Sequence, residues 1–474
     1  MKKRFVNRLT ELDRLDKVYR ASSGQMMVIY GRRRVGKTAL LSHWLDTRGY
    51  KSVFWTADRI SPTVQLRGFS HALRRFAAPD AEIPADFSYG SWENALLEVE
   101  QLSKHERLVV VLDEFTYLIE ADPALPSILQ RLWDHRLQHA NVMLVLTGSH
   151  AGMIEREVLS YRSPLYGRAK WHIPLQPLPF GAVHHFLPGL SAADRLTLYG
   201  CVGGIPQYLE LFSDQADVFT NLEEILESSM ILDDAGALLR DQLSEPRNYM
   251  AVVQSIAAGY TKLSEIATMA GMAPTNATKY LSVLQHLGIV ARQVPATVRD
   301  PDQSRQGRYA VTDPYLRFFF RFLSPSLSYL ERGQRNLVMA NLTQHLAEFT
   351  GTYAFEELCR EWIYAQADTG ALGFVPRRVG SVWGYRQPNI DVVALNPDEH
   401  TILLGECKWW NEAVPKHVVD DLLAKAPKVI PEGNWRVIYA LFSKSGFTTE
   451  AKKAMGQNEC RWVDLKQLDA DLRA

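Results

Sequence analysis

One short segment near the start limits the possible fold more than any other part of the chain: GRRRVGKT, residues 31–38. The apolar run MMVIY precedes it, and ALLSHWL, with apolar residues at helical spacing, follows it. A strand, a glycine-bounded loop and a helix in this order predict a phosphate-binding loop, because backbone N–H groups and a helix N-terminus attract phosphate oxygens. The N-terminal region is therefore expected to form a parallel α/β sheet of the P-loop NTPase kind.

The loop residues have individual expected roles. Gly31 and Gly36 let the backbone curl around the β-phosphate of ATP. Lys37 is expected to reach the β- and γ-phosphates, and Thr38 to offer its hydroxyl to Mg²⁺. The predicted ATP-binding residues of this segment are Gly31, Arg34, Val35, Gly36, Lys37, Thr38 and Ala39.

Two further apolar runs end in polar residues that suit ATP hydrolysis. LVVVLDEF, residues 108–115, predicts a buried parallel strand, with Asp113 holding Mg²⁺ through water and Glu114 orienting and deprotonating the attacking water. NVMLVLTGSH, residues 141–150, predicts another strand, after which Thr147 or Ser149 either senses the γ-phosphate or caps the next helix. With KSVFWTA and WHIPLQPL, these runs predict a five-stranded parallel sheet within residues 1–185.

The middle of the chain reads first as a helical lid, residues 186–250, and then as a winged helix, residues 251–323. Apolar spacing over 260–294 predicts helix, turn and helix, followed by the strand IVARQV and a polar loop. The second helix and the wing either contact DNA phosphates or pack against neighbouring elements. The residues expected to face DNA are Thr275, Asn276, Thr278, Lys279, Arg292, Arg299, Arg305 and Arg308, with Lys279, Arg305 and Arg308 as the main contacts.

A third region follows a linker at 324–345 and occupies residues 346–474. Its segment ILLGECKWW places Glu406 and Lys408 in an apolar strand, where an unpaired charge costs several kcal/mol. IDVVAL, NPDEH and TILLGECKW predict a hairpin, so Asp391 is expected close to Glu406 and Lys408, while Cys407 points into the core. Two carboxylates and a lysine suit a divalent cation and a water to be polarised. The alternative is an ion pair at a solvated strand end.

Composition bounds these interpretations. The chain has 474 residues, 46% of them hydrophobic and 10% aromatic, which indicates a globular protein of several domains. Lysine plus arginine equals aspartate plus glutamate at 53 each, so any surface that attracts nucleic acid must be local. Four cysteines without a CxxC pair argue against a zinc site or a disulfide framework. No signal peptide or spanning helix is expected, and the prediction is a cytoplasmic protein without membrane contact.

Several N-terminal segments together carry a resemblance to a family: FVNRLTELDRL, GRRRVGKT, VVVLDEF, SPLYGRAKWHIPLQPL and GGIPQYL. They are similar to the archaeal-type AAA+ and STAND-related ATPases, which implies a P-loop sheet of the ASCE type. By this resemblance Phe5, Asn7 and Arg8 lie near the adenine, and Gly204 and Pro206 open the lid. Arg168 is implied as an arginine finger, with an ordinary surface or salt-bridged arginine as the alternative. A finger acting in trans implies a homo-oligomer.

The C-terminal pattern, an aspartate followed by Glu-x-Lys after a helix carrying FEELCREW, resembles the PD-(D/E)xK nuclease superfamily and its DUF234-type members. The resemblance implies a restriction-endonuclease-like α/β fold, with Asp391 and Glu406 as Mg²⁺ or Mn²⁺ ligands and Lys408 as the catalytic lysine. Glu356 is the implied further ligand and Glu357 its rival. Ile390 stands where the superfamily's name has proline.

Together these features predict an ATP-hydrolysing protein that couples its nucleotide state to a metal-dependent nuclease, with DNA as the expected substrate and partner. The alternative is a STAND-like regulatory ATPase that binds DNA or a protein partner and carries an inactive nuclease fold.

Overall fold

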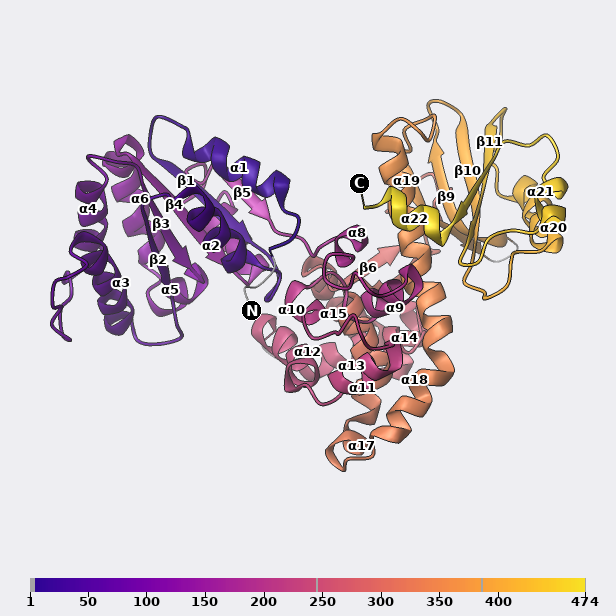
Figure 1. Cartoon of the computed structure of the whole chain (residues 1–474), viewed down its shortest axis with the longest axis horizontal. Coiled ribbons are helices and arrows are strands. Elements are labelled where there is room, and N and C mark those ends of the chain that lie inside the picture. Colours follow the sequence, from indigo (N-terminus) through magenta and orange to yellow (C-terminus); the bar gives the residue numbers. More distant parts are fainter. Residues whose placement is uncertain (1–4, 244–245, 385–386, 474) are drawn as a thin grey trace. The chain divides into compact units, whose positions relative to one another are not determined.

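The computed structural model describes residues 5–243, 246–384 and 387–473 (Figure 1). The chain divides into two compact units. The first unit comprises Met1–Pro177 with Ile205–Gln207, and the second comprises Leu178–Gly204 with Tyr208–Ala474. Each unit contains its own five-stranded sheet, and the second also contains a two-stranded hairpin.

The first sheet confirms the predicted five parallel strands. Its strands are β1 (Gln25–Tyr30), β2 (Ser52–Thr56), β3 (Leu108–Asp113), β4 (Val142–Gly148) and β5 (Trp171–Pro174), in the spatial order β2-β3-β4-β1-β5. Because β4 lies between β1 and β3, the phosphate-loop strand and the strand ending in Asp113 are separated by one strand. All parallel strands end at the same edge, which gathers their polar termini there.

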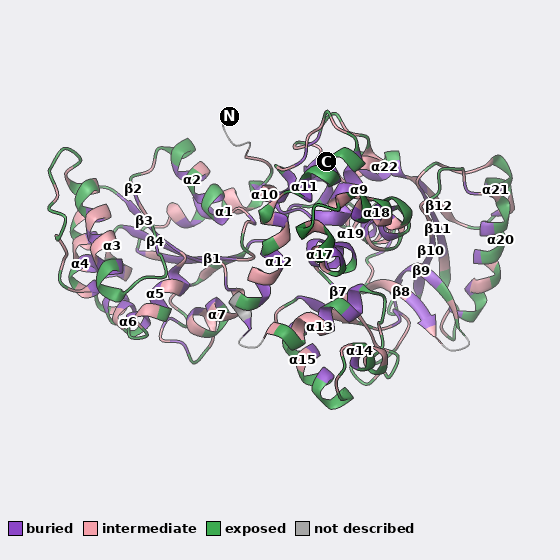
Figure 2. Ribbon diagram, turned by 90° about the horizontal axis from the view of Figure 1, so that it is seen from below, coloured by how far each residue is buried: buried purple, intermediate pink, exposed green. Residues whose placement is uncertain are grey.

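Helices cover both faces of this sheet, and the strands are buried between them (Figure 2). Leu66, Phe69 and Leu132 pack with Val110 and Leu144 of the strands in one hydrophobic core. The helices are α1 (Leu9–Tyr19), α2 (Lys37–Arg48), α3 (Pro62–Ala77), α4 (Trp92–Leu102), α5 (Phe115–Ala121), α6 (Leu125–His135) and α7 (Ala151–Ile154). The β-branched and leucine-rich runs read from the sequence are these buried strands.

Helices then dominate up to residue 286. They are α8 (Phe180–Val183), α9 (Ala192–Val202), α10 (Pro206–Leu209), α11 (Val218–Ile225), α12 (Ser229–Gln242), α13 (Pro246–Ala257), α14 (Leu263–Met269) and α15 (Pro274–His286). An antiparallel hairpin of β6 (Val290–Gln293) and β7 (Arg308–Val311) follows. The order of α14, α15 and this hairpin is the one that the sequence predicts.

The segment predicted as a linker is largely helical. After α16 (Pro314–Phe318) come α17 (Leu327–Glu331) and α18 (Arg335–Phe349), and a π-helical turn over Thr350–Phe355 joins α18 to α19 (Glu356–Asp368). The predicted helix carrying FEELCREW is therefore present as the start of α19.

The second sheet is mixed and has the order β12-β11-β10-β9-β8. Its strands are β8 (Arg378–Gly384), β9 (Gln387–Asn396), β10 (Thr401–Lys408), β11 (Arg436–Ser443) and β12 (Cys460–Asp464). β9 and β10 form the predicted antiparallel hairpin, and β10, β11 and β12 run parallel. Helices α20 (Lys416–Lys425) and α21 (Thr449–Ala454) pack on one face, and α19 and α22 (Leu465–Asp471) on the other (Figure 1).

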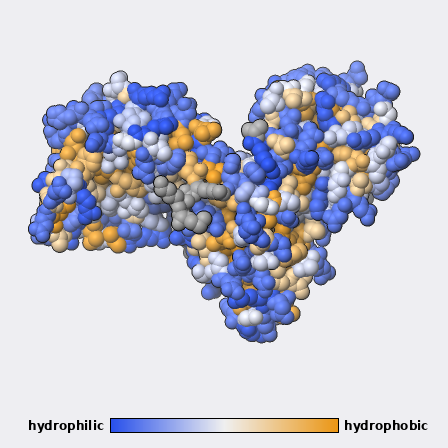
Figure 3. All heavy atoms as spheres, viewed as in Figure 1, coloured by the Kyte–Doolittle hydropathy of each residue, from blue (hydrophilic) through white to orange (hydrophobic). Residues whose placement is uncertain are grey.

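Figure 3 shows hydrophilic residues over the visible face of each unit, interspersed with hydrophobic areas. Within the part of the chain that the structure describes, no helix is long and apolar enough to cross a membrane.

Candidate functional site

The phosphate-binding loop connects β1 to α2 in a conformation that needs its two glycines. Gly31 and Gly36 have φ of 153° and 102°, values that residues with a Cβ rarely adopt. A Cβ at Gly31 would also collide with the carbonyl oxygen of Leu175. Pro206 lies beside the loop, since a Cβ built at Gly36 would stand 3.9 Å from its Cγ.

Lys37, the first residue of α2, is buried and folded back onto this loop. Its Nζ donates to the carbonyl oxygens of Gly31 at 2.9 Å and Arg32 at 3.3 Å, and to Ser149 Oγ at 2.8 Å. Burial lowers the pKa of Lys37, although the carboxylates of Glu114 and Asp113 act in the opposite direction. The lysine is thus a desolvated cation at the place where phosphate oxygens are expected.

Thr38 and Asp113, the two residues predicted to serve Mg²⁺, meet at the edge of the sheet. Thr38 Oγ1 donates to Asp113 Oδ2 at 2.9 Å. The other carboxylate oxygen accepts from the buried hydroxyl of Thr147, whose oxygen in turn accepts the backbone N–H of Glu114 at 3.0 Å. Thr147 therefore fixes the carboxylate of Asp113 and the backbone that carries Glu114.

Glu114 and Ser149 form the second half of this site. Glu114 has φ of 54°, a left-handed conformation that is uncommon and strained for a residue other than glycine, and it is the N-cap residue of α5. Its Oε2 accepts from the backbone N–H of Ser149 at 3.0 Å, and its Oε1 accepts from the Ser149 hydroxyl. Ser149 thereby links Lys37 to Glu114, and His150, not Ser149, occupies the N-cap position of α7.

The residues predicted near the adenine adjoin the same loop. Arg8 is buried with φ of 72°, and its Nη2 donates to the carbonyl oxygens of Val35 at 3.2 Å and Gln176 at 2.7 Å. Asn7 also has positive φ, and its Oδ1 accepts the Arg8 N–H at 2.8 Å. The ring of Phe5 stacks on His43 of α2 at 3.8 Å between centroids.

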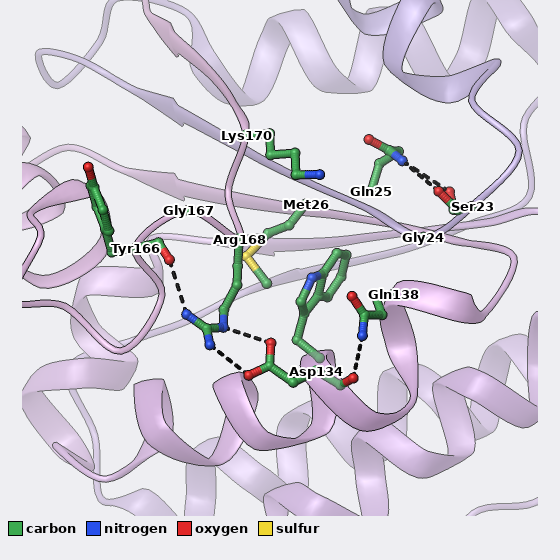
Figure 4. Close-up of a pocket in the computed structure, with 11 residues that line it drawn as sticks. Ser23, Gly24, Gln25, Met26, Asp134, Gln138, Tyr166, Gly167, Arg168 and Lys170 are labelled. Carbon is green, nitrogen blue, oxygen red and sulfur yellow. Dashed lines mark hydrogen bonds and ion pairs between the residues drawn. The ribbon is translucent and has the colours of Figure 1, made fainter.

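Arg168 lies in the pocket drawn in Figure 4, next to Asp134 and away from the phosphate-binding loop of its own chain. It lines a pocket of about 370 Å³ with Ser23 and Gln25, at the start of β1, whereas the loop follows the end of β1. Its Nε and Nη2 donate to the carboxylate of Asp134 at 2.8 and 2.6 Å. These hydrogen bonds raise the pKa of Arg168 and lower that of Asp134. The salt-bridged arginine weighed as the alternative is therefore present within the chain.

A second polar cluster lies at the end of the β9–β10 hairpin. Lys408 Nζ is 2.7 Å from Glu406 Oε1 and 3.9 Å from Asp391 Oδ2. Asp391 Oδ2 also accepts the backbone N–H of Cys407 at 2.9 Å. Asp391, Glu406 and Lys408 thus converge as the sequence predicts.

Burial and charge set the protonation of this cluster. Glu406 is 7% exposed, and its Oε2 is buried without a hydrogen-bond partner in the described structure. Burial and then the Glu406 carboxylate raise the pKa of Asp391. Burial alone would lower the pKa of Lys408, but the Glu406 carboxylate reverses this and raises it. The cluster is a partly desolvated group of acids neutralised by lysine.

Glu356 and Glu357 have different neighbours in the structure, although their spacing in the sequence does not distinguish them. Burial and the neighbouring Asp391 raise the pKa of Glu356 to about 8. Glu357 instead accepts from Arg317 Nη2 at 2.8 Å. Glu356 is accordingly the glutamate near Asp391, and it also pairs with Arg360 at 3.5 Å.

One part of the metal prediction is not met by this arrangement. Among the described residues, no three His, Cys, Asp or Glu side chains form a group able to hold a metal ion. The predicted cage of Glu356, Asp391 and Glu406 is therefore not assembled, because Arg360 pairs with the first and Lys408 with the last. The donors that fit a cation are Asp391 and the unpartnered Oε2 of Glu406.

Lys425, at the end of α20, also belongs to the cluster and was missed from the sequence. Its Nζ is 3.5 Å from Glu406 Oε1. The packing of a helix on a sheet decides which of its residues reaches a strand end, and no spacing in the sequence carries that information. The sequence does show a lysine at the end of an amphipathic helix after the Glu-x-Lys strand, which marks Lys425 as a candidate without identifying its partner.

The wing also differs from the expectation that its arginines face DNA. The guanidinium of Arg308 lies 4.9 Å from the ring centroid of Trp383, and Arg292 Nη1 donates to the carbonyl of Pro301 at 3.1 Å. Trp383 Nε1 donates to Gln306 O at 3.2 Å, which joins the wing to β8. The wing contacts the second sheet through Arg308, whereas Arg292 holds the wing loop itself through its carbonyl oxygens. Lys279 and Arg305 are exposed, as are Thr275, Asn276 and Thr278.

The sheet order, the glycine-bounded loop, and the contacts of Lys37, Thr38 and Glu114 define the N-terminal part as a P-loop ATPase domain. Residues 5–212 match the family of ATPase domains found predominantly in Archaea, and residues 319–419 match a family of archaeal and bacterial proteins of unknown function.

One similar protein extends over almost the whole chain, and others match parts of it. An uncharacterised protein of Methanocaldococcus jannaschii is 28% identical over 466 residues, 98% of this chain and 99% of its own. An uncharacterised ATP-binding protein of the same organism is 40% identical over 47 residues, 10% of this chain and 80% of its own. The solved Walker-type ATPase of Pyrococcus abyssi shares the fold with a TM-score of 0.53 and 19% identity, over 68% of this chain and 97% of its own.

Proposed function

We propose that this chain is an ATPase whose nucleotide state controls a metal-dependent nuclease in the C-terminal domain, with DNA as substrate. The observation that carries the proposal is the convergence of Asp391, Glu406 and Lys408 at one strand end, with a buried carboxylate oxygen left without a partner. A buried carboxylate oxygen without a hydrogen-bond partner is an acceptor that a cation could use, which supports the proposal.

In the ATPase domain different residues would bind the phosphates, hold Mg²⁺ and activate the attacking water. Lys37 would exchange its carbonyl and Ser149 contacts for phosphate oxygens, and Thr38 with Asp113 would hold Mg²⁺. When Lys37 turns to the phosphate, its hydrogen bond to Ser149 is lost. The Ser149 hydroxyl still donates to Glu114 and would orient that carboxylate toward the attacking water. Ser149 is thus the sensing residue, and Thr147 the positioning residue that holds Asp113.

In the C-terminal domain Asp391 and Glu406 would hold Mg²⁺ or Mn²⁺. The bound cation would act as a Lewis acid on a phosphate oxygen and lower the pKa of its water. Lys408, whose raised pKa keeps it protonated, would bind the scissile phosphate beside that cation. Glu356, with a pKa of about 8, is protonated over most of the neutral range and would join the ligand set only on ionisation.

The test is a cleavage assay with purified protein, supercoiled plasmid and linear DNA. Reactions contain Mg²⁺, Mn²⁺ or EDTA, each with and without ATP. Nicking or linearisation that requires the cation and changes with ATP is the expected result. Intact DNA under every condition removes the nuclease part of the proposal.

A second candidate function is a regulatory ATPase in which the C-terminal domain binds DNA or a protein partner without cleaving. One observation favours it: Lys408 and Lys425 both neutralise Glu406 in place of a cation. Under this alternative the cluster is structural. Metal addition would then leave the stability of the C-terminal domain unchanged.

Arg168 gives a prediction about assembly. If it acts in trans as an arginine finger, Arg168→Ala should leave ATP affinity unchanged and lower kcat tenfold or more, because it touches only a neighbour's transition state. Mixing Arg168→Ala subunits with Lys37→Ala subunits should restore part of the missing rate, since each supplies what the other lacks. Asp134→Asn is the matched control that frees the arginine without removing it. If kcat is unchanged in Arg168→Ala and the mixture shows no gain, Arg168 only forms a structural ion pair with Asp134.

Two exposed cations, Lys279 on α15 and Arg305 in the loop between β6 and β7, give a prediction about DNA affinity. Charge reversal at Lys279 and Arg305 should weaken binding and lower the salt dependence, by about 0.9 in slope for every phosphate that the variant no longer neutralises. Arg308→Glu is the contrasting variant, because its cation packs on Trp383 and its removal should lower the melting temperature. Titrations of a labelled duplex at several salt concentrations measure the slope. An unchanged slope in the double variant would assign α15 to packing.

A further inference from the structure

Two tryptophans directly follow Lys408, and they occupy different environments. Trp409 is half-buried, with its ring 5.1 Å from that of Phe355 between centroids. Trp410 is 42% exposed, although a large indole usually gains several kcal/mol from burial. The fold therefore leaves the indole of Trp410 partly exposed beside the Asp391, Glu406 and Lys408 cluster.

Hydrogen bonds hold this aromatic loop in place. Ser445 Oγ donates to the carbonyl oxygen of Trp410 at 2.8 Å, and Lys444 N donates to that of Lys408 at 3.0 Å. Lys444 Nζ donates to Asn411 Oδ1 at 2.7 Å. The loops after β10 and β11 are thus tied together, so the position of Trp410 relative to the acidic cluster is fixed.

Each of the two tryptophan rings has one lysine ammonium near it. Lys408 Nζ lies 5.7 Å from the ring centroid of Trp410, and Lys444 Nζ lies 4.9 Å from that of Trp409. Among the ion pairs of the described residues none involves Lys444, so its charge is not neutralised by an acid there. The exposed indole of Trp410 and the ammonium of Lys444, which lies over the neighbouring Trp409, are thus carried by two loops that hydrogen bonds join. This pair suits a nucleotide, whose base stacks on the exposed ring while its phosphate meets the cation.

We propose that Trp410 and Lys444 form a subsite for an unpaired nucleotide, so that the C-terminal site takes single-stranded DNA or the single-stranded end of a duplex. The inference deepens the proposed nuclease function and rests on it for the cleavage step alone. Bases inside a duplex have both faces covered by their neighbours, so a tryptophan can stack only on a base that is free of the helix.

The experiment measures binding of the full chain to a fluorescein-labelled single strand and to the duplex of the same sequence. EDTA is present throughout, which separates binding from cleavage. The wild type is expected to bind the single strand at least tenfold more tightly than the duplex. Trp410→Ala should lose about tenfold in affinity for the single strand and little for the duplex, whereas Trp410→Phe should retain most of the affinity.

Two further variants control the result. Tyr364→Ala removes another exposed aromatic of the same domain, 52% exposed on α19, and should bind as the wild type does. Lys444→Gln should reduce the salt slope for the single strand by about 0.7, the value for one neutralised phosphate. Circular dichroism checks that each variant is folded. Trp410→Ala is expected to fold, because the Trp410 side chain is partly exposed.

The outcomes separate this subsite from the nuclease itself. Weaker single-strand binding by Trp410→Ala supports the subsite even when no DNA is cleaved under any condition, in which case only the nuclease proposal fails. Equal affinity of Trp410→Ala and the wild type for the single strand overturns the subsite, including when cleavage falls, because the ring then acts only by orienting Lys408. Equal binding of single strand and duplex by a chain with charge reversal at Lys279 and Arg305, which removes the other proposed DNA contact, also overturns it.

Discussion

Lys37→Ala is expected to abolish ATP binding. Its ammonium is the buried cation of the phosphate-binding loop and already contacts two loop carbonyls and Ser149, so its removal leaves the phosphates without their main positive charge. Titration with a fluorescent ATP analogue measures the effect. Lys51→Ala, which removes an exposed lysine just before β2, is the matched control and should bind normally.

Glu114→Gln should separate hydrolysis from binding at the same site. The amide keeps an oxygen that accepts from Ser149 but cannot take the proton of the attacking water, so kcat should fall by about 10²–10⁴ while ATP affinity stays within a few-fold. Ser149→Ala should lower kcat less, because the backbone N–H of residue 149 still donates to the Glu114 carboxylate. Wild-type turnover by Glu114→Gln would show that another group serves as the base.

Much of the fold follows from local patterns. The strands ending in Tyr30, Asp113 and Gly148 are continuous apolar runs, and in a parallel sheet such runs are buried on both faces and end at one edge. The pairing of Asp391 with Glu406 and Lys408 also follows, because a hairpin fixes which residues lie opposite each other. In both cases the information lies within one strand or between two strands joined by a short turn.

The remaining contacts depend on how distant elements pack, and sequence spacing does not determine that. Arg168 reaches Asp134 on α6, and Lys425 reaches Glu406 from α20. Arg308 packs on Trp383, although a polar loop of arginines reads equally well as a DNA-binding wing. Each of these long side chains has several partners within reach, and tertiary packing selects among them.

Cleavage should be abolished when either acid or the lysine of the C-terminal cluster is replaced. Asp391→Asn, Glu406→Gln and Lys408→Ala each remove a group that would hold the cation or the scissile phosphate, while ATP hydrolysis in the other domain should continue. Glu459→Gln is the matched control, because Glu459 forms exposed ion pairs with Arg436 and Arg461 and should cleave normally.

The same variants should differ in stability without metal. Glu406→Gln leaves the half-buried Lys408 and Lys425 without their shared carboxylate, and the free energy of unfolding should fall by about 1–3 kcal/mol. Asp391→Asn instead removes a negative charge facing Glu406, so it should be neutral or stabilising. Urea denaturation in EDTA measures both.

Metal binding distinguishes a nuclease centre from a structural ion pair. In a Lys37→Ala background without nucleotide, Mn²⁺ should raise the melting temperature of the chain, because a ligand that binds only the folded state stabilises it by RT ln(1 + [L]/Kd). Adding Glu406→Gln should remove this increase, since the cation would lose the carboxylate whose buried oxygen has no other partner. If Mn²⁺ raises the melting temperature equally in both proteins, the cation binds elsewhere. If it raises neither, Lys408 and Lys425 are the permanent partners of Glu406, and the regulatory function is favoured.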